Sequence, residues 1–345
     1  MRILCLITCL GAGGAERQLT GLARLLQLRG HQVEVCWFDR SRFYLPFLQE
    51  HGIASRMLPA RSRLGRFLRL KREAARFRPD VVIAFLDGAA TTACRVKKHG
   101  GRFKLIVSER NTNQALTARD SARFALYRTA DAVVCNASAQ AGFIREHVPE
   151  LADKLHVIHN FVDLEYFRPT AGPEKGPGTP LRIVVVARTA AQKNVSGFLE
   201  GVRLAQEQGA RLDVAWFGAD TSQVENGVRF YPPQQDIRPV YQSADALCLP
   251  SLYEGFPNVV GEALACGLPV LCSRVCDNPL LVSEGVEGLL FDPKQPRDIA
   301  RALLAFCALS PDARREMGHK ARLKAEQLLD EERFIGEYMD VCGKL

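Results

Sequence analysis

The chain alternates short apolar runs with longer segments in which apolar residues recur at helical spacing. Short apolar runs bounded by turn residues predict buried strands, and the amphipathic segments between them predict helices. In the first half, the predicted strands are Ile3–Thr8, Gln32–Trp37, Val81–Phe85, Lys104–Val107, Ala132–Cys135 and Leu155–Ile158. Helical patterns follow Gly14, Leu64, Ala89 and Ser138. This alternation predicts a parallel, doubly wound sheet.

A second alternation of strands and helices begins after residue 180. Its predicted strands are Leu181–Val186, Leu212–Trp216, Ala246–Leu249, Pro269–Cys272 and Gly288–Phe291. Between the two halves, the segment 168–180 is rich in proline and glycine and has almost no apolar residues, which predicts a linker. A length of 345 residues suits two domains. We therefore expect an α/β protein with two Rossmann-like domains, residues 1–170 and 171–330, that face a cleft.

The run from Leu249 to Cys272, LPSLYEGFPNVVGEALACGLPVLC, joins two predicted strands and holds the strongest candidate site. Pro257 suits the start of a helix over Asn258–Ala265, and the backbone N–H groups of residues 256–259 would then offer a seat for phosphate. A carboxylate beside a diphosphate would be repelled by it. We therefore expect Glu254 and Glu262 to accept hydrogen bonds from sugar hydroxyls on either side.

Two cations follow the first strand of the second half, Arg188 and Lys193 in VVVARTAAQKN. Arginine offers a planar fork to phosphate oxygens and lysine a point charge, so the pair suits a leaving diphosphate. The loop Gly11–Glu16, GAGGAE, lies between a predicted strand and a helix, and its glycines allow a ligand to approach the backbone. The dinucleotide fingerprint fails there, because Glu16 occupies the third glycine position.

The segment EGFPNVVGEALACGLPV resembles the E-x7-E signature of the retaining nucleotide-sugar glycosyltransferases of family 4, which have the GT-B fold. The resemblance implies that Glu254 contacts the donor sugar and Glu262 holds the ribose. It also implies that the first domain is the acceptor side, that the second binds the nucleotide sugar, and that the last helix, within 331–345, packs back on the first. The implied substrate-binding residues are Gly13, Gly14, Arg188, Lys193, Glu254, Gly255, Phe256, Pro257, Asn258, Val259 and Glu262.

The stretch VSERN, residues 107–111, stands where many family members have a histidine. We take Arg188, Lys193 and Glu254 as candidate catalytic residues, together with Glu109, which would approach donor or acceptor hydroxyls. The identity of any catalytic base stays open. Pro232 and Pro233 alter the loop that faces the nucleobase in relatives, and uridine remains the expected base. The resemblance implies transfer from a UDP-sugar, with an N-acetylhexosamine as our choice, to a saccharide on a lipid or polysaccharide carrier.

Other function classes fit less well. A same-fold epimerase or phosphorylase would need its own base or a cofactor lysine, and a non-catalytic binding protein would release no UDP. The chain has no D-x-D pair, so we expect a metal-independent enzyme with no cofactor besides its donor substrate. Eleven scattered cysteines, many in apolar runs and none in C-x-x-C, are typical of reduced thiols in a cytoplasmic protein.

A net charge of +8 and a pI near 9.0 indicate an anionic partner. Nucleic acid is not expected, because no binding motif or aromatic interleaving accompanies the basic stretches. The segment Arg61–Arg78 combines eight basic residues with leucines and phenylalanines at helical spacing. This helix could rest on anionic lipid at the inner face of the cytoplasmic membrane. Alternatively, it could be a solvated helix that packs its leucine and phenylalanine side on the core, and both interpretations stay open.

Overall fold

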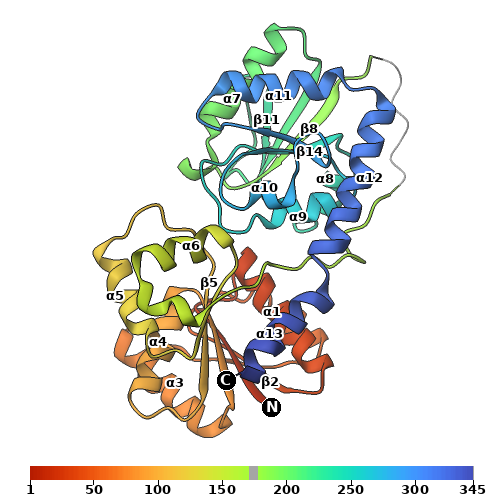
Figure 1. The fold of residues 1–345 in the computed structure, drawn as a ribbon. Helices are drawn as coiled ribbons and strands as arrows, with labels where there is room; N and C mark the ends of the chain where they lie inside the picture. The colour runs from red at the N-terminus through yellow and green to blue at the C-terminus, as the bar shows by residue number, and fades with distance from the viewer. Residues whose placement is uncertain (171–177, 345) are drawn as a thin grey trace. The chain divides into compact units, whose positions relative to one another are not determined.

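The computed structural model describes residues 1–170 and 178–344, which form two compact units (Figure 1). Unit 1 consists of Met1–Asn160 together with the helix α13 (Glu331–Lys344), and unit 2 of Phe161–Asp330. We expected the first domain to extend to residue 170, but Val162 and Phe167 pack in the core of unit 2. Of the predicted linker 168–180, residues 171–177 lie outside the described residues.

Unit 1 is built on a seven-stranded sheet of order β3-β2-β1-β4-β5-β6-β7, in which every pairing is parallel. The strands are β1 (Arg2–Ile7), β2 (Gln32–Trp37), β3 (Ala54–Met57), β4 (Val81–Phe85), β5 (Lys104–Glu109), β6 (Ala132–Cys135) and β7 (Leu155–Val157). The predicted doubly wound parallel sheet is confirmed. Strand β3 was not predicted, because the sequence ASRM of this edge strand has no apolar run and none of its residues is buried.

The helices of unit 1 before α13 cover this sheet. They are α1 (Gly14–Leu28), α2 (Leu45–Glu50), α3 (Arg63–Phe77), α4 (Asp87–Lys98), α5 (Ala118–Tyr127) and α6 (Ser138–His147), with a 3-10 turn at Pro149–Lys154. Helix α4 packs between α3 and α5 (Figure 1). Helix α13 is held to α1 by Arg24, whose Nη2 donates to the carboxylate oxygens of Glu331 at 2.7 and 2.8 Å.

Unit 2 has its own seven-stranded sheet, of order β10-β11-β9-β8-β12-β13-β14. The strands are β8 (Leu181–Val186), β9 (Leu212–Phe217), β10 (Gln223–Glu225), β11 (Val228–Tyr231), β12 (Ala246–Leu249), β13 (Val270–Ser273) and β14 (Gly288–Phe291). All pairings are parallel except β10 with β11. This hairpin was not predicted, although Asn226 and Gly227, both at positive φ, form the two-residue turn that such a pair favours.

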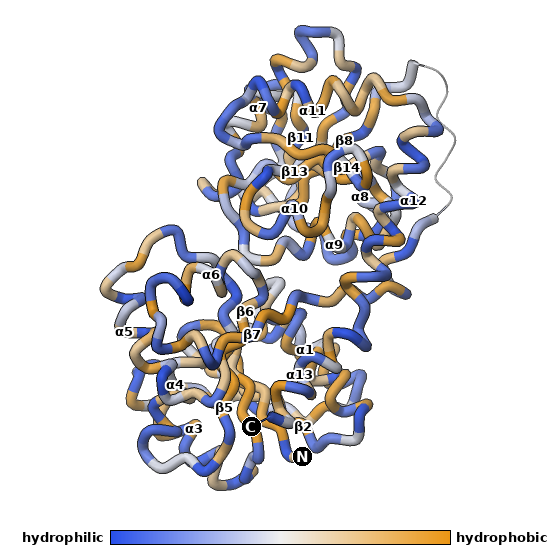
Figure 2. The backbone as a smooth tube through the Cα atoms, viewed as in Figure 1, coloured by the Kyte–Doolittle hydropathy of each residue, from blue (hydrophilic) through white to orange (hydrophobic). Residues whose placement is uncertain are grey.

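Helices pack on both faces of the unit 2 sheet, since residues of alternate strand positions belong to two separate apolar cores. The helices are α7 (Val195–Glu207), α8 (Arg238–Gln242), α9 (Asn258–Ala265), α10 (Asn278–Leu281), α11 (Pro296–Ala308) and α12 (Pro311–Leu328), and a 3-10 turn spans Ala191–Lys193. The inner strands of each unit are its most continuous hydrophobic segments (Figure 2). No helix in the described part of the chain is long and apolar enough to cross a membrane.

Candidate active site

The turn between β12 and α9 has the form that the sequence predicts. Strand β12 ends at Leu249, and α9 begins at Asn258 after Pro257, which has extended backbone angles and whose side chain caps no N–H group. Phe256 and Pro257 are buried, whereas Gly255, Asn258 and Val259 are partly exposed. The N-terminus of α9 therefore carries the positive end of its helix dipole next to a partly open turn.

Glu254 lies in this turn and pairs with Lys193, whose Nζ donates to its Oε1. The side chains are only 8% and 16% exposed, so the pair is poorly solvated. The two loops are also joined through Gln192: its carbonyl oxygen accepts from the N–H of Leu252 at 2.8 Å, and its Nε2 donates to the carbonyl oxygen of Tyr253 at 2.8 Å. The structure thus brings together two residues that the sequence analysis named separately.

Glu262 lies within α9 and is 3% exposed. The hydroxyl of Tyr241, at the end of α8, donates to Glu262 Oε2 at 2.9 Å. This bond fixes the carboxylate from within unit 2. Sequence reasoning missed Tyr241, because a tyrosine in a short apolar helix carries no signal that distinguishes it from a core residue.

Arg188 follows β8 and is exposed. No carboxylate of the described residues lies within salt-bridge distance of it. Its loop is anchored from β9: Trp216 Nε1 donates to the carbonyl oxygen of Ala187 at 2.6 Å. Gly218, at φ 117°, lies so close that a Cβ would stand 2.5 Å from the same oxygen. Only glycine fits this position, so the backbone before Arg188 is fixed while its guanidinium stays accessible.

Gly13 and Gly14 belong to unit 1, where Gly13 caps α1 and Gly14 is its first residue. The carboxylate of Glu16 folds over them: a Cβ on Gly13 would lie 2.2 Å from Glu16 Oε2. Cys9 Sγ donates to Glu16 Oε1 at 3.1 Å, and Gly13 N donates to the carbonyl oxygen of Gly11 at 2.9 Å. A side chain added at Gly13 would therefore have to displace the flexible end of Glu16.

Glu109 ends β5 and is 2% exposed. Tyr127 Oη donates to its Oε1 at 2.6 Å, Gln140 Nε2 donates to its Oε2 at 3.4 Å, and Arg123 Nη2 lies 3.4 Å from Oε2. Burial raises the pKa of Glu109 to about 7, against the opposing effect of the Arg123 charge. The carboxyl group is therefore surrounded by side chains of its own unit and titrates near neutrality.

Arg110, the next residue, was not singled out from the sequence. It is 8% exposed, its Nη1 donates to Asn160 Oδ1 at 2.8 Å, and its guanidinium stacks 3.9 Å from the centre of the Phe85 ring. Its Nε and Nη2 have no hydrogen-bond partner in the part of the chain that is described. Burial lowers the pKa of this guanidinium. The only signal in the sequence was its place at the end of a strand, beside Glu109.

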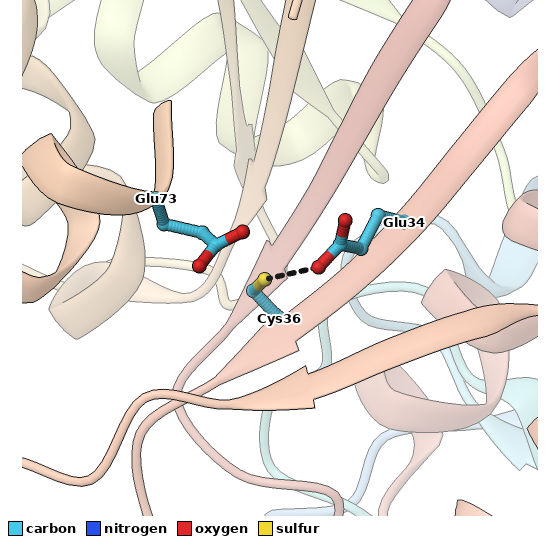
Figure 3. Close-up of side chains that lie close together, drawn as sticks. All are labelled: Glu34, Cys36 and Glu73. Carbon is cyan, nitrogen blue, oxygen red and sulfur yellow. Dashed lines mark hydrogen bonds between the residues drawn. The ribbon is translucent and has the colours of Figure 1, made fainter. Parts of the chain in front are cut away.

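Glu34, Cys36 and Glu73 form a buried cluster whose ligand atoms lie within 4.8 Å of one another, as a metal site requires (Figure 3). Both carboxylates, however, accept hydrogen bonds from Arg76, and the guanidinium of Arg56 lies 3.4 Å from Glu34 and 3.7 Å from Glu73. Burial raises the pKa of the Cys36 thiol well above its usual range, so it is not a thiolate. The cluster fastens α3 to β2 through arginine.

The comparisons with known proteins agree with this architecture. Residues 12–166 match the family model Glycosyltransferase Family 4, and residues 180–308 match the model Glycosyl transferases group 1. Each half of the chain is thus similar to a glycosyltransferase domain. The solved structures place it in the GT-B fold: Alr3699/HepE of Anabaena, in complex with UDP-glucose, superposes with a TM-score of 0.85 at 18% identity, over 100% of both chains. A sucrose-phosphate synthase of Thermosynechococcus elongatus gives 0.80 at 17% identity over 100% and 99%.

Curated relatives of this GT-B chain are also named as glycosyltransferases. WcaL of Escherichia coli, named for colanic acid biosynthesis, is 28% identical over 275 residues, which cover 72% of this chain and 67% of WcaL. A D-inositol 3-phosphate glycosyltransferase of Streptomyces scabiei is 31% identical over 58% of this chain and 51% of its own. The chain therefore spans between half and two thirds of the length of these relatives.

Proposed function

We propose that this protein is a retaining, metal-independent glycosyltransferase that transfers a sugar from a UDP-sugar to a saccharide acceptor on a lipid or polysaccharide carrier. The observation that carries the proposal is the pair of Lys193 and Glu254 beside the N-terminus of α9. A cation and an acceptor of hydroxyl hydrogens stand together there, next to a helix N-terminus. A sugar diphosphate needs positive charge for its phosphates and a hydrogen-bond acceptor for its sugar hydroxyls at the point where the sugar joins the diphosphate.

The leaving diphosphate would be neutralised by three groups of unit 2. Arg188, exposed at the end of β8, can offer its fork to two phosphate oxygens, and Lys193 supplies a second positive charge. The N-terminus of α9 adds partial positive charge from its backbone. Because Lys193 and the N-terminus of α9 are held in place before the reaction, they would stabilise negative charge as it develops on the diphosphate. This is the basis for proposing a reaction without a metal ion.

The carboxylates would recognise hydroxyl groups on either side of the diphosphate. Glu254 has one oxygen engaged by Lys193 and keeps lone pairs for the donor sugar. Glu262, oriented by the hydroxyl of Tyr241, would accept from the ribose. Gly13 and Gly14 would let the donor or acceptor approach the backbone of unit 1. Glu109, buried among Tyr127, Gln140 and Arg123, would act by positioning rather than by contact with a sugar.

The donor and acceptor are proposed from the relatives. HepE was crystallised with UDP and with UDP-glucose, which supports uridine as the base. WcaL is named for the synthesis of a polysaccharide, which supports a carrier-linked saccharide as acceptor. An N-acetylhexosamine is our choice of donor sugar. A release assay for UDP, with a panel of UDP-sugars and carrier-linked acceptors, tests the proposal. Binding of UDP-sugars with no release of UDP would favour a non-catalytic binding protein.

We further propose a cytoplasmic location with α3 resting on anionic lipid. Leu64 and Leu68 lie one turn apart on α3 and are 66% and 55% exposed. Exposed basic residues surround them: Arg61, Arg63, Arg69, Lys71 and Arg72. Exposed leucines inside a basic rim suit the boundary between head groups and acyl chains. Arg66, in contrast, is paired with Asp39 at 3.1 Å and packs over Phe38.

A further inference from the structure

A basic pocket of about 420 Å³ in unit 1 is lined by residues of α3, α4 and α5. Figure 1 shows α4 between α3 and α5. Its wall carries five guanidinium groups and a single carboxylate, Asp87. The arginines come from all three helices: Arg63 and Arg66 from α3, Arg95 from α4, and Arg119 and Arg123 from α5. None of the residues proposed for donor binding lines it.

Only part of this positive charge is neutralised within the protein. Arg123 Nη1 lies 2.7 Å from Asp87 Oδ2, and its Nη2 lies 3.1 Å from Asp120 Oδ1. Arg66 is paired with Asp39. Arg63, Arg95 and Arg119 have no carboxylate of the described residues within salt-bridge distance. Three guanidinium groups of like charge in one pocket repel one another, and a bound anion would relieve that repulsion.

Among the polar side chains that line the pocket, the threonine hydroxyls are engaged within the protein, and the guanidinium groups remain as donors. Thr91 Oγ1 donates to the carbonyl oxygen of Asp87 at 2.7 Å, and Thr92 Oγ1 to that of Gly88 at 2.7 Å, so both hydroxyl hydrogens are already used. A Cβ on Gly88 would lie 3.3 Å from Arg66 Nη1 and 2.9 Å from Thr8 Oγ1. Because Gly88 has no side chain, Arg66 can reach the start of α4.

We propose that this pocket binds a phosphate or diphosphate group and that, on the function proposed above, the group belongs to the carrier that bears the saccharide acceptor. Planar guanidinium forks match pairs of phosphate oxygens, and several from different helices can surround one tetrahedral group. The donor's own diphosphate has Arg188 and Lys193 of unit 2 for this purpose. The arginines of unit 1 are therefore available to a second anionic substrate.

Titration calorimetry of the full chain with inorganic pyrophosphate, in the presence of saturating UDP, tests the pocket. Arg95→Ala combined with Arg119→Ala should weaken pyrophosphate binding at least tenfold. A control that removes two exposed arginines of unit 1 outside the pocket, Arg102→Ala with Arg145→Ala, should bind within twofold of the wild type. Equal affinity in the pocket variant and the wild type, or no binding by the wild type, would overturn the proposal.

Two further measurements distinguish the carrier's phosphate from a phospholipid head group, and a failure of the pocket proposal from a failure of the proposed function. The pocket variant should sediment with phosphatidylglycerol vesicles as the wild type does; equal binding, or none by either protein, excludes phospholipid head groups. Loss of vesicle binding confined to the variant would overturn the carrier assignment. UDP binding, measured alone, should be unchanged in the variant. If the wild type binds no UDP, the proposed function fails, and the pyrophosphate titration without UDP still tests the pocket.

Discussion

Lys193 donates a hydrogen bond to Glu254 although 61 positions separate them in the chain. The strands that precede them explain the contact. β8 and β12 are parallel neighbours in the sheet, with Ile183 paired to Ala246, so the loops that leave their carboxyl ends meet. In open α/β sheets, ligands bind outside the carboxyl ends of the strands. The sheet order therefore delivers the cation and the carboxylate to one place.

Nucleotide binding should depend on Glu262 and, to a smaller extent, on Tyr241. Glu262→Ala removes a charged acceptor worth roughly 1.5 to 3 kcal/mol, so UDP should bind about 10 to 100 times more weakly by calorimetry. Tyr241→Phe keeps the carboxylate but removes the hydrogen bond that orients it, so the affinity for UDP should fall less than tenfold. Glu225→Ala, an exposed control in the same unit, should bind UDP as the wild type does. Unchanged affinity in Glu262→Ala would contradict the ribose assignment.

Activity should survive removal of divalent metal ions but not removal of the cations of unit 2. With EDTA, the rate of UDP release should stay within about twofold of the untreated enzyme. Lys193→Ala should lower kcat by about 10² to 10³, the usual cost of removing a preorganised electrostatic group. If EDTA abolishes turnover and manganese restores it, the metal-independent mechanism is wrong.

Glu109 should make unit 1 less stable as the pH rises. Its pKa is raised from 4.5 to about 7, so the folded state binds its proton more tightly than the unfolded chain does. Between these two values, the unfolded chain loses the proton first, and the stability that the bound proton provides is gone above pH 7. The free energy of unfolding, relative to Glu109→Gln, should therefore fall by roughly 2 to 3 kcal/mol between pH 5 and 8.

The two tryptophans allow this measurement to be confined to one unit. Trp37 ends β2 in unit 1 and Trp216 lies in β9 of unit 2. In a Trp216→Phe background, urea unfolding followed by tryptophan fluorescence reports on unit 1 alone. Parallel pH profiles of the glutamate and glutamine proteins would show that Glu109 is not the group that titrates.

Membrane contact should depend on the exposed leucines of α3. Leu64→Ser with Leu68→Ser removes two apolar side chains that burial in lipid would stabilise by about 1.5 to 3 kcal/mol each. Sedimentation with phosphatidylglycerol vesicles at low salt should fall at least tenfold. Leu323→Ser, at a 42% exposed leucine of unit 2, is the matched control. Undiminished vesicle binding by the double variant would mean that α3 is only a solvated helix.

The sequence predicted best those features that depend on neighbouring residues. Helix α9 spans Asn258–Ala265 as expected, because proline and a preceding buried strand define its start locally. Strand β3 was not predicted, since an edge strand without buried residues lacks the apolar run that is typical of a buried strand. The turn at Asn226–Gly227 did carry a local hairpin signal, but the strands beside it are only three and four residues long.

Features that depend on tertiary packing were beyond prediction from the sequence. The basic stretch Arg61–Arg78 reads as one amphipathic surface, yet the structure divides its arginines among different partners. Arg76 neutralises buried carboxylates, Arg66 pairs with Asp39, and Arg63 lines a pocket with arginines from two other helices. Burial likewise changed the interpretation of Glu109, because the side chains that enclose it come from α5 and α6.

The position of α13 has a consequence for how the chain folds during synthesis. Phe334, Ile335 and Tyr338 of this helix are buried in unit 1, but the whole of unit 2 precedes them in the sequence. Unit 2 is one continuous stretch and can complete its core as it leaves the ribosome, whereas unit 1 keeps an uncovered apolar surface until α13 has been made. The half of the protein that is translated first is thus the half that finishes folding last.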